Sequence, residues 1–331
     1  MMRRILIIKP SSIGDVIHTF PCVALMRKAF GNDLRISWVV NENLRGVVEL
    51  CPGVDRIVPF PRAKMWNVSC IRAFLKELRS EEYDVALDYQ GLLKSGLIAY
   101  FSRARLRVGF AHSREGSPFF YNRKVHVVDL HTHAVDKNVQ LTREALGIGE
   151  DIGIGDVPVS IKSRPRCGKV VAVCFSSRWE SKNWPLSFFA DVLRDVAGQR
   201  KETRFLLIGS KEDEAQGEKL VELAAMQNVV NLAGKTSFNE LAVALAEADV
   251  LFTVDSGPMH LAAVCGTPCV ALFGSTDPVL TGPYGAPGFH TVLRSNCEKA
   301  PCFKRKCPLG RDCSFEEARA LAASAIISHL K

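Results

Sequence analysis

The sequence predicts an α/β protein made of two halves, each with a parallel β-sheet, that face one cleft. One observation is a strand, turn and helix pattern in which the apolar run 249–254 precedes the turn Asp255-Ser-Gly-Pro-Met-His260. The same pattern opens the chain, where the apolar run Ile5–Ile8 precedes the polar turn 9–14. Helix N-termini carry unpaired N–H groups that suit an anion such as a diphosphate. Two such turns, roughly 240 residues apart, favour two nucleotide-binding halves.

The first half alternates β-rich runs with amphipathic segments, which predicts parallel strands joined by right-handed crossovers. In the first helix Val16, Phe20 and Val23 follow helical spacing, and Pro21 is a predicted kink. The predicted strands are Ile5–Lys9, Arg35–Val40, Arg56–Pro59, Val85–Tyr89 and Arg107–Phe110, and the predicted helices are Asp15–Ala29, Ser69–Ser80 and Leu92–Ser102.

The polar, glycine-containing stretch Gly147–Lys169 is interpreted as the linker region. Beyond it, Ser237 and Glu240 have the spacing of a capping box, which predicts a helix start. The predicted strands are 169–175, 204–208, 229–232, 250–254 and 269–273, and helices are expected from Pro185, from Lys211, over Ser237–Ala248 and from Pro258. We therefore expect domains at 1–160 and 161–313, and an alanine-rich helix in 314–331 that packs back on the first domain.

Composition and charge limit the class of protein. With 331 residues, 47% hydrophobic and 24% charged, the chain is typical of a soluble globular protein with two domains. The net charge of +8 fits a basic solvated surface or an acidic partner, namely a nucleotide, a phosphorylated lipid or an anionic membrane face. No apolar run approaches the ~20 residues of a transmembrane helix or the ~7–15 of a signal-peptide core. We expect a cytoplasmic protein that can visit a membrane peripherally.

The turn Pro10-Ser-Ser-Ile-Gly-Asp15 resembles a phosphate loop but lacks the Gly-Lys-Ser/Thr ending of a nucleotide hydrolase. It also lacks the GxGxxG pattern, which argues against a dinucleotide-dependent oxidoreductase. Asp15 stands where a helix begins, and two roles are open for it. Its carboxylate either complements the helix dipole or acts as a general base at the strand's carboxyl end.

Three polar segments follow predicted strands of the second half. The hydroxyls and Lys182 in the loop Ser176–Pro185 suit phosphate oxygens, and the alternative is a polar loop with a hydrophobic staple. The position of the loop after a strand's carboxyl end modestly favours the functional interpretation. An acid in Glu212–Glu214 suits ribose hydroxyls or a helix's first turn. His260 fits a phosphate donor or a structural hydrogen bond.

Basic and aromatic residues mark the first half, as in Phe119–Lys124 and at Arg62, Lys64 and Arg114. No zinc-finger or RNA-recognition signature accompanies them, so an anionic acceptor sugar is favoured over nucleic acid. The chain also has eleven cysteines, most of them interpreted as reduced core residues. Structural zinc, disulfides and unligated thiols stay open for the basic segment that contains Cys297, Cys302, Cys307 and Cys313.

Together these motifs resemble glycosyltransferase family 9, the ADP-heptose:lipopolysaccharide heptosyltransferases, over essentially the whole chain. The stretch Tyr121–Lys124 with His133–Asp136 is similar to heptosyltransferase I, and the cysteine-rich tail to other branches, including heptosyltransferase II. The segments that carry the resemblance are Lys9–His18, Asp88–Lys94, Tyr121–Lys124, Ser181–Pro185, Asp255–His260 and Gly274–Pro278.

The resemblance implies a GT-B fold, in which two Rossmann-like domains face a central cleft. It implies Asp15 as the catalytic base and Lys182 as the diphosphate or transition-state partner. Further nucleotide-sugar ligands would be Ser176, Ser177, Asp213, Asp255, Ser256, Gly257, Pro258, Met259 and His260. The acceptor, bound by the first domain, would contact Ser12, Gly14, Arg62, Lys64, Gln90, Lys94 and Arg114.

The implied activity is inverting, metal-independent transfer of a heptose from ADP-L-glycero-D-manno-heptose to the Kdo region of the lipopolysaccharide inner core. No cofactor would be required, and the partner would be Kdo-lipid A or inner-core lipopolysaccharide at the cytoplasmic face of the inner membrane. Three alternatives stay open: transfer to the first heptose as in heptosyltransferase II, a GT-B sugar-nucleotide epimerase, and a non-enzymatic nucleotide-sugar or metal-binding regulator.

Overall fold

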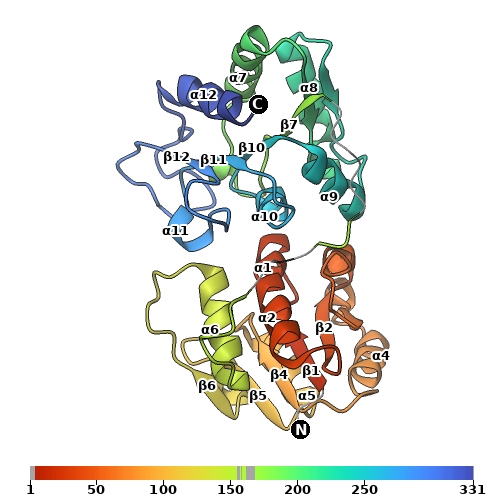
Figure 1. Cartoon of the computed structure of the whole chain (residues 1–331). Coiled ribbons are helices and arrows are strands. Elements are labelled where there is room, and N and C mark those ends of the chain that lie inside the picture. Colours follow the sequence, from red (N-terminus) through yellow and green to blue (C-terminus); the bar gives the residue numbers. More distant parts are fainter. Residues whose placement is uncertain (1–3, 155–156, 158, 162–167, 331) are drawn as a thin grey trace. The chain divides into compact units, whose positions relative to one another are not determined.

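The computed structural model describes residues 4–154, 157, 159–161 and 168–330, and the chain divides into two compact units, Met1–Ser160 and Ile161–Lys331 (Figure 1). The boundary falls within the stretch interpreted as the linker, of which Pro158, Pro165 and Cys167 lie outside the described residues. In the described ranges, no helix is both long and apolar enough to cross a membrane.

The first unit is built on a six-stranded parallel sheet with the order β3-β2-β1-β4-β5-β6. The five predicted strands of this half are confirmed to within one residue at each end. The last strand was not predicted, because it has three residues and two of them are exposed basic side chains. The strands are β1 (Arg4–Ile8), β2 (Arg35–Asn41), β3 (Arg56–Phe60), β4 (Val85–Asp88), β5 (Leu106–Phe110) and β6 (Arg123–Val125).

Helices cover both faces of this sheet. On one face α2 (Phe20–Phe30) and α6 (Ala134–Leu146) lie side by side (Figure 1). On the other face α4 (Val68–Leu78) and α5 (Leu93–Phe101) cover a buried cluster that includes Ile8 of β1. The shorter helical segments are α1 (Ile13–Ile17), η1 (Glu42–Leu44), α3 (Arg45–Val48), η2 (Arg62–Lys64) and η3 (Ser117–Phe120).

The single helix predicted from Asp15 to Ala29 is wrong in one respect. The structure has two helices, because α1 ends at Ile17 and α2 begins at Phe20. Pro21 lies in the first turn of α2, where its missing N–H costs no helical hydrogen bond. The proline thus starts a new helix rather than kinking an old one.

The second unit has its own six-stranded parallel sheet, in the order β12-β11-β10-β7-β8-β9. Every predicted strand of this half is confirmed to within one residue, and the short, partly exposed last strand was not predicted. The strands are β7 (Lys169–Cys174), β8 (Thr203–Leu207), β9 (Val229–Asn231), β10 (Val250–Val254), β11 (Cys269–Phe273) and β12 (Thr291–Arg294).

The predicted capping box of the second unit is confirmed. The Ser237 N–H donates to the Glu240 carboxylate (2.8 Å) at the start of α9 (Phe238–Glu247), and the Glu240 N–H donates to the Ser237 hydroxyl (3.3 Å). The other helical segments are η4 (Glu180–Lys182), α7 (Leu186–Gln199), η5 (Lys211–Asp213), α8 (Glu214–Ala224), α10 (Gly257–Val264), α11 (Pro278–Thr281) and α12 (Ala318–His329).

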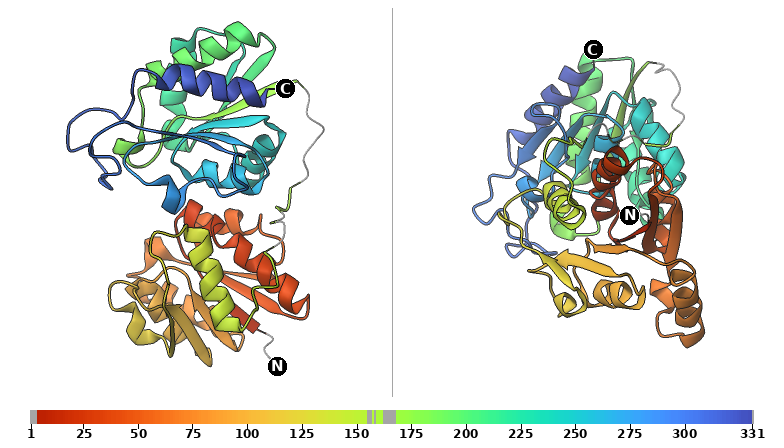
Figure 2. Two further views of the ribbon diagram at one scale, coloured as in Figure 1. Left: turned by 60° about the vertical axis from the view of Figure 1, so that its left-hand side comes forward. Right: turned by 60° about the horizontal axis from the view of Figure 1, so that its bottom comes forward.

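The position predicted for the C-terminal helix is wrong. α12 belongs to the second unit, where it lies along α7, as both views of Figure 2 show. Ala318, Ala322 and Ile326 are buried in the same apolar cluster as β7, β10 and β11. The small alanine side chains allow close packing on the sheet and on α7, so the helix completes the core of the second unit.

Candidate functional site

Each sheet has one place where the connections change direction, between β1 and β4 in the first unit and between β7 and β10 in the second. In open α/β sheets, ligands bind outside the carboxyl ends of the strands at such a point. The loops that follow β1 and β4, and those that follow β7 and β10, carry most of the predicted site residues. The topology of each unit therefore predicts that ligands bind at these loops.

Asp15 lies in the first turn of α1, directly beyond β1. The Ser12 N–H (2.9 Å) and the Ser12 hydroxyl (2.7 Å) both donate to its Oδ2, which closes a capping box. The other oxygen, Oδ1, lies 3.5 Å from the Lys9 ammonium, and the side chain stays 45% exposed. The carboxylate therefore caps the helix with one oxygen and leaves the second near solvent and a cation.

The surroundings of Asp15 keep it ionised. Partial burial alone would raise its pKa, but the Lys9 ammonium, the two hydrogen bonds from Ser12 and the nearby His18 outweigh that effect. The pKa of Asp15 is therefore held well below its ordinary value of 3.8. A proton acceptor in the ionised form is present throughout the physiological pH range.

Lys9 is a site residue to which the sequence argument gave no role. Its side chain is buried, and its ammonium donates to the carbonyl of Tyr89 (2.9 Å) in the loop after β4. The signal was a single basic residue at the end of an apolar strand. Through Lys9, the loops after β1 and β4 are joined beside Asp15.

The predicted acceptor residues fall into two groups. Ser12 bonds to Asp15, the Gln90 side chain accepts from the Ser11 N–H (3.2 Å), and Gly14 is buried inside α1. These three are thus at or beside Asp15. Lys94 and Arg114 are exposed around the loop after β4, where the Arg114 N–H donates to the Gly91 carbonyl, and Arg62 and Lys64 are exposed on η2 after β3.

In the second unit Lys182 and Asp255 form a close ion pair, with 2.6 Å between Nζ and Oδ2. The two side chains are only 16% and 5% exposed. The hydroxyl of Thr276, which the sequence argument did not single out, donates to the same Oδ2 (2.5 Å). The pair ties the loop after β7 to the loop after β10 and fixes the Lys182 ammonium at the carboxyl edge of the sheet.

The turn after β10 has the expected form, since α10 begins at Gly257 with Ser256 as its N-cap. Pro258 has no N–H, and the Met259 N–H donates to the Ser256 carbonyl (3.2 Å), so these two residues offer little to an anion. The Gly257 N–H is a first-turn group with no partner earlier in the helix. His260 is buried in the following turn. The anion-binding capacity of the turn therefore centres on Gly257 and Lys182.

Ser176 and Asp213 belong to one hydrogen-bonded cluster, and Ser177 bonds separately within the loop after β7. The Ser176 hydroxyl donates to Asp213 Oδ1 (2.5 Å), and Asp213 Oδ2 accepts from the N–H (2.7 Å) and hydroxyl (2.6 Å) of Ser210. The Ser177 N–H donates to the Asn183 side chain (2.7 Å). A carboxylate oxygen can accept two hydrogen bonds, so Oδ1 of Asp213 keeps one lone pair for a ligand.

A segment far along the chain braces the Lys182 loop. The Ser181 N–H donates to the Arg305 carbonyl (3.1 Å), and the Ser181 hydroxyl donates to the Lys304 carbonyl. The Trp179 ring has the Lys182 ammonium 4.9 Å from its centroid and the Arg305 guanidinium 5.8 Å away. The cysteine-containing segment thus holds the loop that presents Lys182, a contact that spacing in the sequence does not reveal.

The four cysteines of that segment do not form a metal centre. Across the described part of the chain, no group of three or more His, Cys, Asp or Glu side chains could hold a metal ion. Cys297, Cys302, Cys307 and Cys313 are free thiols, as are the described scattered cysteines. Burial raises the pKa of Cys313 to about 11, which fits a packed, protonated thiol. The unligated-thiol alternative therefore describes the structure.

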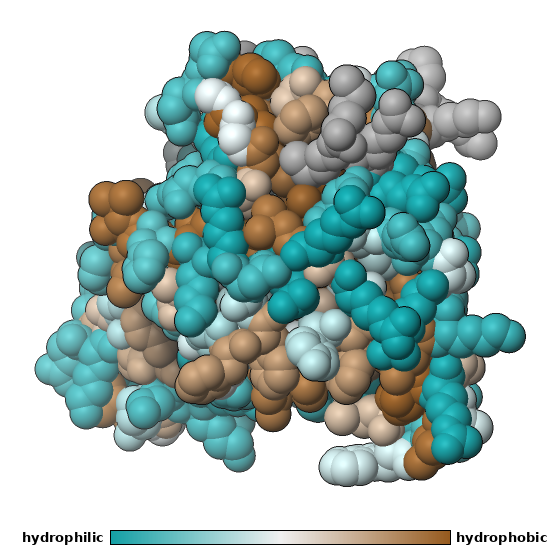
Figure 3. All heavy atoms as spheres, turned by 90° about the horizontal axis from the view of Figure 1, so that it is seen from below, coloured by the Kyte–Doolittle hydropathy of each residue, from teal (hydrophilic) through white to brown (hydrophobic). Residues whose placement is uncertain are grey.

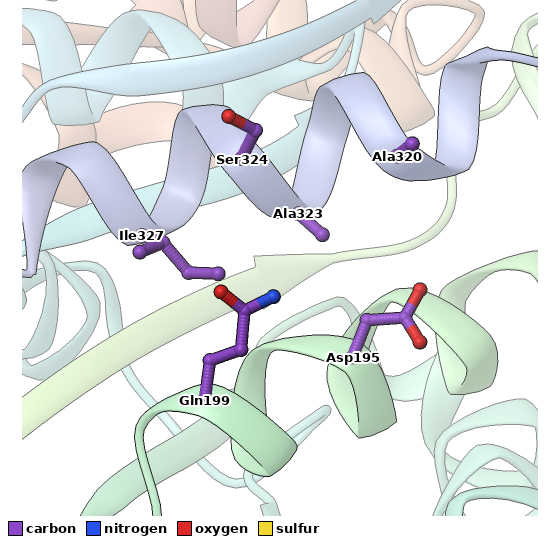
Figure 4. A pocket seen from close by; sticks show the side chains of 6 residues that line it. All are labelled: Asp195, Gln199, Ala320, Ala323, Ser324 and Ile327. Atoms are coloured by element: carbon purple, nitrogen blue, oxygen red, sulfur yellow. The ribbon is translucent and has the colours of Figure 1, made fainter.

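A surface depression of about 370 Å³ lies between α7 and α12, away from these loops (Figure 4). Its lining includes Asp195, whose carboxylate pairs with Arg319 of α12 (2.6 Å), and small side chains. None of the lining residues is a predicted site residue. The residues are Asp195, Gln199, Ala320, Ala323, Ser324 and Ile327.

Comparison with known proteins adds an independent line of evidence. The model of glycosyltransferase family 9 (heptosyltransferase) matches residues 71–312, well over half of the chain. Lipopolysaccharide heptosyltransferase 1 of Pseudomonas aeruginosa is 29% identical over 92% of this chain and 87% of its own. The protein of that name from Escherichia coli is 29% identical over 85% of this chain and 91% of its own.

Among solved structures, E. coli heptosyltransferase WaaC with ADP superposes with a TM-score of 0.83 at 26% identity, covering 98% of this chain and 99% of that one. The predicted GT-B class is confirmed by this similarity and by the two parallel six-stranded sheets. The matches also confirm that the protein is a glycosyltransferase.

Proposed function

Because the chain belongs to glycosyltransferase family 9, we propose that it transfers a heptose from ADP-L-glycero-D-manno-heptose to the Kdo region of the lipopolysaccharide inner core. The observation that carries the proposal is the chemistry at the two switch points. The first unit presents an ionised carboxylate, Asp15, and the second presents an ammonium, Lys182, beside a helix N-terminus. A base and an anion site are the two groups that transfer from a nucleotide sugar requires.

In the proposed reaction Asp15 Oδ1 accepts the proton of an acceptor hydroxyl as that oxygen bonds to the anomeric carbon. The bond from that carbon to the ADP oxygen breaks on the opposite face, which inverts the configuration. The transition state is oxocarbenium-like, as in glycoside hydrolysis. A carboxylate with a lowered pKa suffices, because the hydroxyl becomes strongly acidic as its new bond forms.

The departing diphosphate gains negative charge, which Lys182 and the Gly257 N–H would stabilise in this proposal. We propose that these groups do the work of a metal ion, so transfer should persist in excess EDTA. Asp213 Oδ1 is the proposed ribose ligand, since it retains one lone pair. Adding the diphosphate would loosen the Lys182–Asp255 pair, because the ammonium must turn toward the phosphate.

The acceptor proposal rests on charge and on the relatives. Arg62, Lys64, Lys94 and Arg114 are exposed cations around the carboxyl edge of the first sheet. They suit an acceptor rich in carboxylates and phosphates, such as Kdo-lipid A at the cytoplasmic face of the inner membrane. The names of the two relatives favour transfer of the first heptose over transfer to an existing heptose.

Mass spectrometry of the products tests this function directly. The enzyme is mixed with ADP-heptose and either Kdo-lipid A or its once-heptosylated form. We expect one added heptose on Kdo-lipid A and none on the heptosylated form. Product on the second acceptor alone would assign heptosyltransferase II activity. Conversion of ADP-heptose without any acceptor would contradict transfer and favour an epimerase.

A further inference from the structure

Trp66 is one of the most exposed large apolar side chains of the protein, at 92%, and Val68 beside it is 64% exposed. Apolar and hydrophilic side chains are interspersed over the face shown in Figure 3, which is ordinary for a protein surface. Exposure alone therefore indicates no function for Trp66. The backbone conformation and the charge around Trp66 are more informative.

The backbone around Trp66 is ordered on both sides. The Asn67 N–H donates to the Lys64 carbonyl (2.9 Å), which closes the turn of η2. The Asn67 side chain then caps α4 by accepting from the N–H groups of Ser69 (3.0 Å) and Cys70 (3.2 Å). Trp66 is thus held outward by a turn and a helix cap that do not depend on its own side chain. We call residues 62–68 the Trp66 loop.

The sequence on both sides of the Trp66 loop is rich in basic residues. From Arg56 to Lys76 the sequence has five basic residues and no acidic one. Arg62, Lys64, Arg72 and Lys76 are exposed, and within the described residues none of the four forms an ion pair. An exposed indole close in sequence to unpaired cations complements a surface that has anionic groups on the outside and an apolar layer beneath them.

The position of the loop fits the same surface. The Trp66 loop follows the carboxyl end of β3, and Asp15 follows the carboxyl end of β1 in the same parallel sheet. The two therefore lie on one edge of the first unit. A contact made by the loop would hold the edge that carries Asp15 close to whatever surface the loop touches.

We propose that the Trp66 loop anchors the protein to an anionic lipid bilayer, with the Trp66 ring and Val68 in the interfacial region and the four cations at the phosphates. Tryptophan is favoured at membrane interfaces, and each nearby cation adds attraction to anionic lipid. Two apolar side chains are too few for a stable protein interface, which needs about 1,000 Å². The inference deepens the proposed function, because it names how the enzyme reaches an acceptor embedded in lipid.

Co-sedimentation with acceptor-free vesicles tests the anchor in the full-length protein. We expect binding to vesicles that contain phosphatidylglycerol, weak binding to pure phosphatidylcholine, and a loss of binding with salt. Trp66→Ala should lower the vesicle affinity roughly tenfold by removing the buried ring area, and Lys76→Gln about fivefold. Trp66→Phe should retain part of the affinity, since it keeps an aromatic ring.

Val128→Ala is the matched control, because Val128 is 93% exposed in the same unit but is followed by the acidic Asp129. Its vesicle affinity should equal that of the wild type. Brominated lipid should quench Trp66, because Trp38 and Trp184 are buried and Trp179 is half-buried in the second unit, and most of the quenching should vanish in Trp66→Phe. Equal losses in Trp66→Ala and Val128→Ala, or unchanged binding in both, would overturn the anchor.

Kinetics with a lipid-free, Kdo-containing acceptor separate the anchor from a sugar contact. For Trp66→Ala we expect unchanged kcat and KM on that soluble acceptor and a lower rate on Kdo-lipid A in vesicles. A raised KM for the soluble acceptor with normal vesicle binding would indicate that Trp66 contacts the acceptor, and would contradict the proposal. Absence of heptose transfer by the wild type would refute the proposed function and leave the vesicle result standing.

Discussion

The contacts of Asp15 bear on the two roles that its position in the sequence left open. One oxygen caps α1 through Ser12, as a first-turn acid commonly does, and the other faces Lys9 and solvent. Capping orients the carboxylate and the cation keeps it ionised. The helix-capping role is therefore compatible with the proposed role as a base.

The lowered pKa of Asp15 predicts a pH-dependent contribution to stability. The folded-state pKa lies below the unfolded value of 3.8, so ionised Asp15 stabilises the first unit above about pH 4. The contribution is lost as the pH falls through the folded-state value. Urea unfolding of wild type and Asp15→Asn, followed at the buried Trp38, should show a larger difference at pH 7 than at pH 3. A difference independent of pH would refute the role of Lys9.

Lys182 predicts a linked loss of stability and affinity. Lys182→Met leaves Asp255 buried without its cation, which should cost the second unit about 3–5 kcal/mol. It should also weaken ADP-heptose binding by calorimetry, and Lys182→Arg should restore part of both. Lys211→Met is the control, because its pair with Glu214 is solvent-screened and its loss should leave the stability close to that of the wild type. Normal ADP-heptose affinity in folded Lys182→Met would remove Lys182 from the site.

At the level of elements, the buried strands were predictable and the short or exposed ones were not. Apolar runs such as Val250–Val254 predict a strand that is buried on both faces. β6 has only one buried residue, and α6 is a predominantly polar helix whose buried face is visible only after its partner α2 is known. Periodicity reports an apolar face, so it fails for β6, which is nearly all surface, and for α6, whose buried face includes polar side chains such as Asn138 and Thr142.

The brace on the Lys182 loop yields a prediction for Trp179. Its ring contacts both Lys182 and Arg305, and cation–π contacts of this kind are worth about 0.5–2 kcal/mol each. Trp179→Ala should therefore lower kcat about tenfold with a smaller change in the KM for ADP-heptose, and Trp179→Phe should recover most of the rate. Equal loss in both variants, or a change in KM alone, would contradict a positioning role.

For the whole molecule, the sequence predicted two nucleotide-binding halves, and the structure has two compact units with one switch point each. Turn chemistry predicted Asp15, Lys182 and Asp255 as candidates, and they lie in the segments that follow β1, β7 and β10. Contacts between distant segments, such as Ser181 with Arg305 and Thr276 with Asp255, leave no local pattern. The packing of α12 escaped prediction for the same reason.

The corrected place of α12 can be tested by a change in its core. Ile326 is fully buried, so Ile326→Ala should cost the second unit about 2–5 kcal/mol. Leu321 of the same helix is 47% exposed, and Leu321→Ala should change the free energy of unfolding by under about 0.5 kcal/mol. Urea unfolding followed at Trp184, in the same core, measures both. Destabilisation of the first unit by Ile326→Ala would contradict this packing.

The central proposal is that Asp15 is the base of heptose transfer and is not needed to bind ADP-heptose. The most direct measurement is single-turnover heptose transfer by Asp15→Asn, with ADP-heptose affinity determined on the same preparation. The account predicts a rate lower by about 10²–10⁴-fold or more and an affinity close to that of the wild type. A near-normal transfer rate in Asp15→Asn would contradict it.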